Sequence, residues 1–363
     1  VSVFDTSKMA DIKALIATTD DDGSQVSDIA SLDALIDRAI NALAFIMDKA
    51  QKNSATIDFP VEQDYLNASV SGVNSVNLPV LNNFLNLSSI QAVNIDTSAK
   101  LQDIVTGYDA IIQSADGVLG NSVAPTLTHF NALGITGIDS VAKQNLITDL
   151  IDGLIVAQID TQAKIQVLAD LALDVMDGVN GVSGKPSKSS LETMGFDRLS
   201  DANMNAVQKA IAATANDGSE VDSKVELQSV IDKVVQALEL ISQYDGSNTR
   251  PVVQDYADAQ VSNVDAVNLT VINDLVGNLL PAASDSDVEL QTIVDSYNLV
   301  LDAADGVDND AAKASAEDYS NLSITGISSA AAISLLGDVL DIKAGTDVDT
   351  TTKIQNLANI VQE

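Results

Sequence analysis

The chain has 363 residues, of which 46% are apolar, and it carries 18 basic against 52 acidic side chains. The resulting net charge of −34 argues against nucleic acid and anionic lipid as partners, because both repel an acidic surface. Cysteine is absent, which excludes disulfides and a thiolate nucleophile. No apolar run reaches the roughly 18 residues that a membrane helix needs, so we expect no membrane insertion.

A pair formed by an apolar residue and glutamine recurs along the chain, each time at the start of a helical pattern. Five copies follow one another at a nearly constant interval, and a weaker copy precedes the first of them at a slightly longer one: Leu32-Asp33, Leu101-Gln102, Ile165-Gln166, Leu227-Gln228, Leu290-Gln291 and Ile354-Gln355. Such a regular interval is typical of repeat proteins, in which each repeat is one supersecondary unit that packs against its neighbours.

Residues 139–194 display the elements that we expect in each repeat. Asp139-Ser140 opens a first helix with apolar residues at three- and four-residue spacing: Leu146, Ile147, Leu150, Ile151, Leu154 and Ile155. Thr161 suits the N-cap of a second helix, which is expected to end at Asp177-Gly178 because glycine readily adopts the left-handed conformation that closes helices. Asp-Gly pairs recur at 116–117, 245–246 and 305–306, and a shorter third helix is expected in 187–194.

These elements predict an all-α fold, built as a tandem array of about six helical units of ~63 residues, each with two helices of about 16 to 18 residues and one short helix. The predicted units are 1–64, 65–129, 130–190, 191–255, 256–318 and a truncated unit, 319–363. Units four to six resemble units one to three: Gln63-Asp64-Tyr65, at the boundary between units one and two, returns as Gln254-Asp255-Tyr256 at the boundary between units four and five. The sequence leaves open whether the units form linked three-helix bundles or an α-solenoid.

Clusters of acidic residues in loops are the one pattern that indicates a metal site. Calcium binds six to eight oxygen ligands from loops of this kind, so we consider calcium a possible cofactor, with these candidate ligands: Asp20, Asp22, Asp217, Asp305, Asp308 and Asp310. None of these clusters has the EF-hand spacing. The alternative is that these carboxylates form polar turns and helix caps in an acidic protein.

Residues that carry catalytic chemistry are scarce. His129 is the only histidine, which excludes a site with two histidine ligands, and we expect it at the surface beside Phe130. The sequence contains no phosphate-binding loop, dinucleotide fingerprint or nucleophile elbow. We therefore expect no enzyme activity and assign no catalytic residue.

One segment carries a resemblance to known proteins. Ile324-Thr325-Gly326-Ile327, a helix, and then Val348-Asp349-Thr350 with Lys353-Ile354-Gln355 resemble the tandem helical repeats of very large, acidic, cysteine-free surface and adhesin-like proteins of Gram-negative bacteria. The resemblance extends over essentially the whole chain. It implies an extracellular or cell-surface location and a non-enzymatic, extended repeat protein, and it brings no binding residues with it.

Two functions follow from this organisation. The first is a structural stalk, spacer or filament segment, whose units contact neighbouring repeats of a longer chain or associate head to tail with another copy. The alternative is a binding module that holds a peptide, a partner helix or a glycan in grooves between units. A binding surface would concentrate exposed aromatic residues in one or two units. The tyrosines instead lie at equivalent positions, as core anchors would: Tyr65, Tyr108, Tyr256, Tyr297 and Tyr319.

Overall fold

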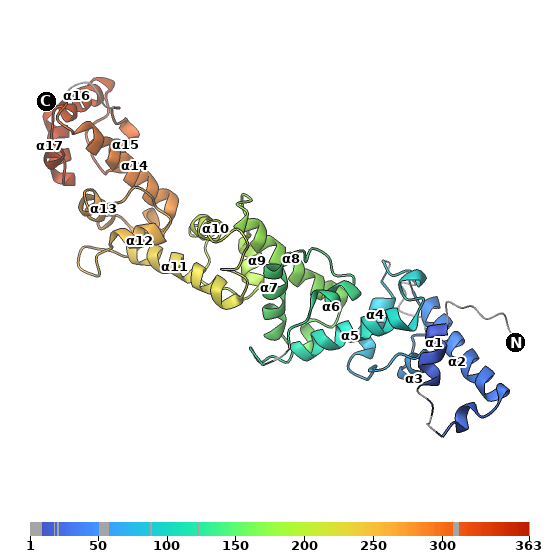
Figure 1. Ribbon diagram of the computed structural model, residues 1–363. Coiled ribbons are helices and arrows are strands. Elements are labelled where there is room, and N and C mark those ends of the chain that lie inside the picture. Colours follow the sequence, from blue (N-terminus) through green and yellow to red (C-terminus); the bar gives the residue numbers. More distant parts are fainter. Residues whose placement is uncertain are drawn as a thin grey trace. The chain divides into compact units, whose positions relative to one another are not determined.

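The structure is a computed structural model that describes residues 9–17, 19, 22–50, 58–87, 89–121, 123–307 and 312–362. Within these ranges it contains seventeen α-helices, short 3-10 turns and no β-strand (Figure 1). The only β-type backbone pairing among the described residues consists of two isolated bridges, Asp116 with Ile155 and Asp305 with Ala344. The predicted all-α class is therefore confirmed.

Three kinds of α-helix alternate along the chain, and we call them short, middle and long. The short helices have six residues each: α3 (Glu62–Asn67), α6 (Leu127–Ala132), α9 (Lys188–Thr193), α12 (Val253–Asp258) and α15 (Ala316–Asn321). The middle helices are α1 (Met9–Ile16), α4 (Leu78–Leu85), α7 (Val141–Asp152), α10 (Met204–Ala212), α13 (Leu269–Val276) and α16 (Ala330–Asp341). The long helices are α2 (Ile29–Asp48), α5 (Ser98–Ser114), α8 (Gln162–Val179), α11 (Lys224–Ser242), α14 (Asp287–Ala303) and α17 (Thr351–Ile360).

A 3-10 turn precedes five of the six long helices: η2 (Ser24–Val26), η3 (Ala92–Asn94), η4 (Val156–Gln158), η5 (Pro281–Ala283) and η6 (Gly345–Asp347). By its contacts the chain divides into two compact units, Val1–Leu173 with Asp222–Lys224, and Asp174–Val221 with Val225–Glu363. The short, middle and long helices alternate in both. Whether the chain consists of six separable repeats remains a prediction.

The loops between short and middle helices share an unusual backbone. In all five described copies, two residues three positions apart adopt a positive φ, between 59° and 91°. The first position holds Ser69, Gly134, Gly195, Gln260 and Ser323, and the second holds Gly72, Gly137, Arg198, Asn263 and Gly326. The same loop conformation is therefore formed by very different residues, so the backbone repeats more closely than the sequence does.

The middle helices are shorter than predicted. They span 8 to 12 residues rather than 16 to 18, whereas α2, α5, α8, α11 and α14 span 17 to 20. In α7 the helix ends at Asp152, and Leu154 and Ile155, expected on its apolar stripe, lie outside it. The amide of Ile155 donates to Gln158 Oε1 (3.0 Å) and Ile155 pairs with Asp116, so the turn η4 begins where the helix was expected to continue.

The predicted stop at Gly178 is wrong. Helix α8 continues through Gly178 to Val179, whereas the glycines of the other three Asp-Gly pairs have the expected left-handed φ: Gly117, Gly246 and Gly306. Gly178 lies against the segment that leads to α9, where a Cβ atom would be 2.5 Å from Pro186 Cδ and 2.9 Å from the Lys185 carbonyl oxygen. A glycine is needed here for close packing, not for a turn.

The five tyrosines are core residues, as predicted, each exposing 1% or less of its surface. They occupy two kinds of position rather than one, since Tyr65, Tyr256 and Tyr319 lie on short helices and Tyr108 and Tyr297 lie on long helices. In two copies the tyrosine joins a network that ties the short helix to the middle helix. Tyr256 donates its hydroxyl proton to Asn273 Oδ1 (2.8 Å), and Asn273 Nδ2 donates to the Pro251 carbonyl (2.8 Å). The same chain of bonds links Tyr65, Asn82 and Pro60, at 3.2 and 2.9 Å.

A tyrosine inside such a network and a tyrosine whose hydroxyl has no partner should respond differently to a Tyr→Phe change. Tyr256→Phe leaves the Oδ1 atom of the fully buried Asn273 without this donor, so we expect a loss of about 1 to 2 kcal/mol in the free energy of unfolding. The Tyr108 hydroxyl is buried with no hydrogen-bond partner among the described residues, so Tyr108→Phe should be neutral or stabilising. Chemical denaturation of both variants measures the contrast, and equal losses would contradict it.

The glutamine of the apolar-Gln pair clamps the backbone of the loop that follows the short helix. Oε1 of Gln166 accepts the amide proton of Thr136 (3.0 Å), and its Nε2 donates to the carbonyl of the same residue (3.1 Å). Three other copies make the same pair of bonds: Gln102 with Ser71, Gln291 with Ser262 and Gln355 with Thr325. The apolar partner is buried in every full copy: Leu101, Ile165, Leu227, Leu290 and Ile354.

Gln166→Glu tests this clamp with almost no change in shape. A carboxylate can still accept from the Thr136 amide, but its second oxygen then faces the Thr136 carbonyl, so we expect a loss of about 1 to 2 kcal/mol in unfolding free energy. Gln63→Glu is the matched control, because Gln63 lies exposed on α3 and makes one side-chain bond, to Asn67. Equal effects of the two changes in chemical denaturation would mean that the clamp contributes nothing.

Candidate functional site

The predicted calcium ligands that the structure describes are used in turns. Asp22, Asp217 and Asp305 each accept the amide proton of the residue two positions later, at 2.8, 3.0 and 2.7 Å. These backbone bonds hold the pKa of Asp22 and of Asp217 below the usual value. Asp20, Asp308 and Asp310 lie outside the described residues.

No group of three or more metal-binding side chains assembles in the part of the chain that the structure describes. The arrangement of Asp22, Asp217 and Asp305 is that of polar turns. Calcium at these loops stays a prediction.

His129 lies half-buried rather than at the open surface. It is the third residue of α6, and its Nδ1 accepts the amide proton of Thr126 (3.2 Å), the residue that precedes the helix. Asp64, Asp255 and Asp318 make the same bond at the corresponding place in α3, α12 and α15. The histidine therefore caps its own short helix.

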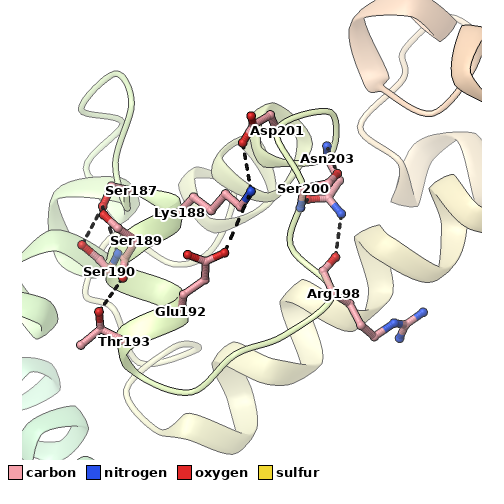
Figure 2. A network of polar contacts seen from close by, with 10 residues as sticks. All are labelled: Ser187, Lys188, Ser189, Ser190, Glu192, Thr193, Arg198, Ser200, Asp201 and Asn203. Carbon is pink, nitrogen blue, oxygen red and sulfur yellow. Dashed lines mark hydrogen bonds and ion pairs between the residues drawn. The ribbon is translucent and has the colours of Figure 1, made fainter.

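A polar network surrounds α9 in the second compact unit (Figure 2). The Lys188 Nζ atom lies 3.0 Å from the Asp201 carboxylate and 4.0 Å from that of Glu192. The Ser187 hydroxyl accepts the Ser190 amide proton (3.1 Å) and thereby caps α9. Both ion pairs reach solvent, so each contributes about 1 kcal/mol or less to stability.

Arg198 connects the loop after α9 to the long helix α11. Its backbone carbonyl accepts from Asn203 Nδ2 (2.9 Å), and Asn203 Oδ1 accepts the Ser200 amide proton (2.9 Å) (Figure 2). Its Nη2 atom lies 2.6 Å from Glu239 Oε2. The side chains in Figure 2 pair with each other, with the backbone or, for Arg198, with carboxylates of α11, so their arrangement fixes the loop after α9.

Asp174 is a buried carboxylate that holds the segment leading into α9. It accepts from Lys185 Nζ and from the Ser187 amide (2.8 Å). Burial alone would raise its pKa, but the bonds from Lys185, Ser190 and Ser187 together lower it below the usual value. The ionised form is thus the one that the fold stabilises.

This carboxylate predicts a pH dependence. A folded-state pKa below the unfolded value near 3.9 gives stability that is present above that value and is lost as the pH falls through the folded pKa. Asp174→Asn should therefore lower the free energy of unfolding by about 2 kcal/mol at pH 7, because charge-assisted bonds are lost. As the pH falls from about 5 to 2, the free energy of unfolding should decrease less in this variant than in the wild type. Chemical denaturation across that range measures both effects. Asp201→Asn, whose carboxylate is 97% exposed, is the control and should change stability at pH 7 by less than about 1 kcal/mol.

A recurring contact joins a middle helix to the start of the second long helix after it, and we call it the junction. In the first compact unit, Asp149 on α7 accepts the backbone amide proton of Lys224 (2.7 Å), and Asn145 Nδ2 donates to Asp222 (2.7 Å). In the second unit, Lys209 on α10 forms an ion pair with Asp287, the first residue of α14 (2.7 Å). The helix α13 likewise packs against α17.

The junction at Asp287 buries a charge completely. Asp287 has no exposed surface, Lys209 reaches one of its oxygens, and the other oxygen has no hydrogen-bond partner among the described residues. A buried carboxylate with one cation depends strongly on that cation. No sequence motif singles out Asp149, Lys209 or Asp287; only their places in the repeat could have indicated them.

Grooves are present in both compact units. One of about 560 Å³, in the first compact unit, is lined by apolar groups that include Phe84, Ile90 and Ile104. Another of about 670 Å³, in the second, is acidic, with Asp265, Asp295 and Asp302 on its wall. The large aromatic side chains that would anchor a ligand are instead buried in the cores: Tyr65, Tyr108, Phe130, Tyr256, Tyr297 and Tyr319.

No family model, curated protein or solved structure matches this chain. In the described part of the chain, no helix combines the length and the apolar character needed to cross a bilayer.

Proposed function

We propose that this chain is a non-enzymatic structural repeat protein, a spacer, stalk or filament segment located outside a bacterial cell. The observation that carries the proposal is the recurrence of one set of contacts. The glutamine clamp is present in four copies, the two left-handed loop positions in five, and the cap on the short helix in four. A protein selected to span distance repeats its framework, whereas a catalytic or binding protein concentrates its special residues at one place.

The use of polar residues supports the same proposal. The histidine, the buried Asp174 and the three described acidic turns bond to nearby backbone, so these side chains hold loops and helix ends in place. The dense negative charge that remains keeps such a chain soluble and separated from its neighbours. The surface location rests on the resemblance to adhesin-like repeats.

Small-angle X-ray scattering of the whole chain tests the proposal. A compact globular protein of 363 residues has a radius of gyration of about 21 Å, and we expect a value at least about 1.5 times larger for a spacer. The measurement is made with calcium and with a chelator. An increase only with calcium would assign the metal to the acidic loops, and the value of a compact globular protein in both conditions would contradict the spacer.

A further inference from the structure

Three of the long helices carry a pair of acidic residues at the same distance from the glutamine of the apolar-Gln pair. The two acids stand four and eleven positions after that glutamine: Asp170 and Asp177 on α8, Asp232 and Glu239 on α11, and Asp295 and Asp302 on α14. Residues seven positions apart are separated by about two helical turns and lie on one face of a helix. The three pairs are therefore equivalent, and the groups around them can be compared.

On α11 the acidic pair holds a guanidinium group. Arg198 occupies the second left-handed position of the loop before α10. Its Nη1 atom lies 3.6 Å from Asp232 Oδ1, and its Nη2 atom lies 2.6 Å from Glu239 Oε2. A planar guanidinium has donors that can reach two carboxylates at once. This copy of the repeat thus shows which kind of group the acidic pair accepts.

On α14 the equivalent place is a groove, and no described side chain supplies a cation there. Asn263 stands at the loop position that Arg198 occupies in the preceding copy, with nearly the same φ, 62° against 63°. The groove of about 670 Å³ lies beside it, with Asp295 and Asp302 on its wall. Both carboxylates are exposed, and neither forms an ion pair within the described ranges. The acidic pair of this copy is therefore accessible to a cation from another molecule.

The bonds of the acidic pair also match between the two copies. Asp295 accepts from Gln291 Nε2 (2.8 Å), as Asp232 accepts from Gln228 Nε2 (2.9 Å) while it also faces Arg198. A carboxylate has about four acceptor positions, so the bond from the glutamine leaves room for a further donor. The geometry that binds Arg198 on α11 is thus preserved on α14.

The remainder of the groove suits the stem of a long cationic side chain. Val264, Val267 and Leu299 line it together with the acids, and Val267 is 68% exposed. Arginine lays its methylene groups along apolar surface while its charged end stays at polar groups. A small cation would gain nothing from these apolar side chains.

We propose that the groove formed by Asp295, Asp302 and the loop at Asn263 binds an arginine side chain of a partner protein, in the way that Asp232 and Glu239 hold Arg198. The two carboxylates complement the charge of the guanidinium, and Val267 and Leu299 contact its methylene groups. The site goes beyond the proposed spacer function, because it gives one copy of the repeat a partner that the other copies do not share.

Nuclear magnetic resonance of the whole chain, labelled with nitrogen-15 at asparagine, tests the proposal. The probes are three capped tripeptides with valine at both ends and arginine, lysine or citrulline in the middle; citrulline has the shape of arginine without its charge. We expect the arginine peptide to shift the side-chain amide signals of Asn263 and Asn298, which line the groove. The citrulline peptide should bind at least about tenfold more weakly. The lysine peptide should also bind more weakly than arginine, because an ammonium group is a point charge.

Asn263→Arg is the sharpest variant, because it should fill the groove from within. The introduced guanidinium would stand where Arg198 stands in the preceding copy, at a φ that Arg198 also adopts, so peptide binding should fall at least about tenfold. Asp302→Asn should weaken binding by a similar factor. Glu317→Gln is the control, since it removes an exposed charge on α15 outside the groove and should leave binding unchanged. Circular dichroism checks that all variants are folded.

A general attraction between a cation and an acidic protein would give different results. Equal binding of the arginine and lysine peptides, or equal effects of Asp302→Asn and Glu317→Gln, would overturn the arginine site. The same conclusion would follow if the arginine peptide left the signals of Asn263 and Asn298 unchanged. The spacer proposal would remain in each case, since the radius of gyration tests it separately.

Discussion

Lys209→Met should destabilise the chain by about 3 kcal/mol, the largest effect that we expect from one surface-reaching side chain. The change removes the cation that pairs with Asp287, whose carboxylate has no exposed surface and whose second oxygen already has no partner among the described residues. A buried carboxylate without a counter-ion destabilises the fold by far more than the half-exposed lysine contributes through its own contacts. Chemical denaturation at pH 7 measures the loss.

The double variant K209M/D287S separates this cause from lost packing. Serine occupies the equivalent first position of α5, as Ser98, so the double variant should recover most of the stability that Lys209→Met loses. Lys188→Met is the control, since its partner Asp201 is almost fully exposed, and a change of less than about 1 kcal/mol is expected there. A double variant as unstable as Lys209→Met alone would show that the buried charge is not the cause.

Gly178→Ala should cost at least about 2 kcal/mol, although alanine normally stabilises a helix interior by about 1 kcal/mol relative to glycine. The added methyl group would lie 2.5 Å from Pro186 Cδ and 2.9 Å from two backbone atoms, which cannot move without displacing the segment held by Asp174. Thermal unfolding measures the effect as a lower Tm.

Gly337→Ala is the matched control for this change. Gly337 is also inside a helix, α16, but its nearest neighbours are side-chain carbons of Lys313, which can rotate away. The equivalent positions in α4, α7, α10 and α13 hold Asn82, Thr148, Gln208 and Asn273, so this site accepts side chains. We expect a neutral or slightly higher Tm. Equal losses at both glycines would mean that the contact with Pro186 does not matter.

The features that depend on local pattern could be predicted from the sequence. The apolar-Gln pairs located the long helices, Ser140 and Thr161 cap α7 and α8 as expected, and the tyrosines are buried as core anchors. These predictions succeeded because caps and apolar periodicity are formed by residues a few positions apart. The all-α class followed from the same patterns.

The features that could not be predicted depend on residues far apart in the chain. Helix α7 was predicted too long because the apolar run continues through Leu154 and Ile155, while pairing of Ile155 with Asp116, which follows the preceding long helix α5, redirects the chain. Gly178 was assigned to a turn because the packing of Pro186 against it is invisible in the sequence. The reason for the glutamine in each pair also appeared only with the loop that it clamps, far earlier in the chain.

The junctions make the middle helices non-interchangeable. At one junction the carboxylate lies on the middle helix, at Asp149, and at another it lies on the long helix, at Asp287, with a lysine opposite. A recombination event that replaced α10 with a copy of α7 would set Asp149 against Asp287. Asp287 is fully buried, so the two carboxylates would repel each other without a counter-ion. A change of length that preserves these contacts therefore has to keep each middle helix together with the long helix that it meets.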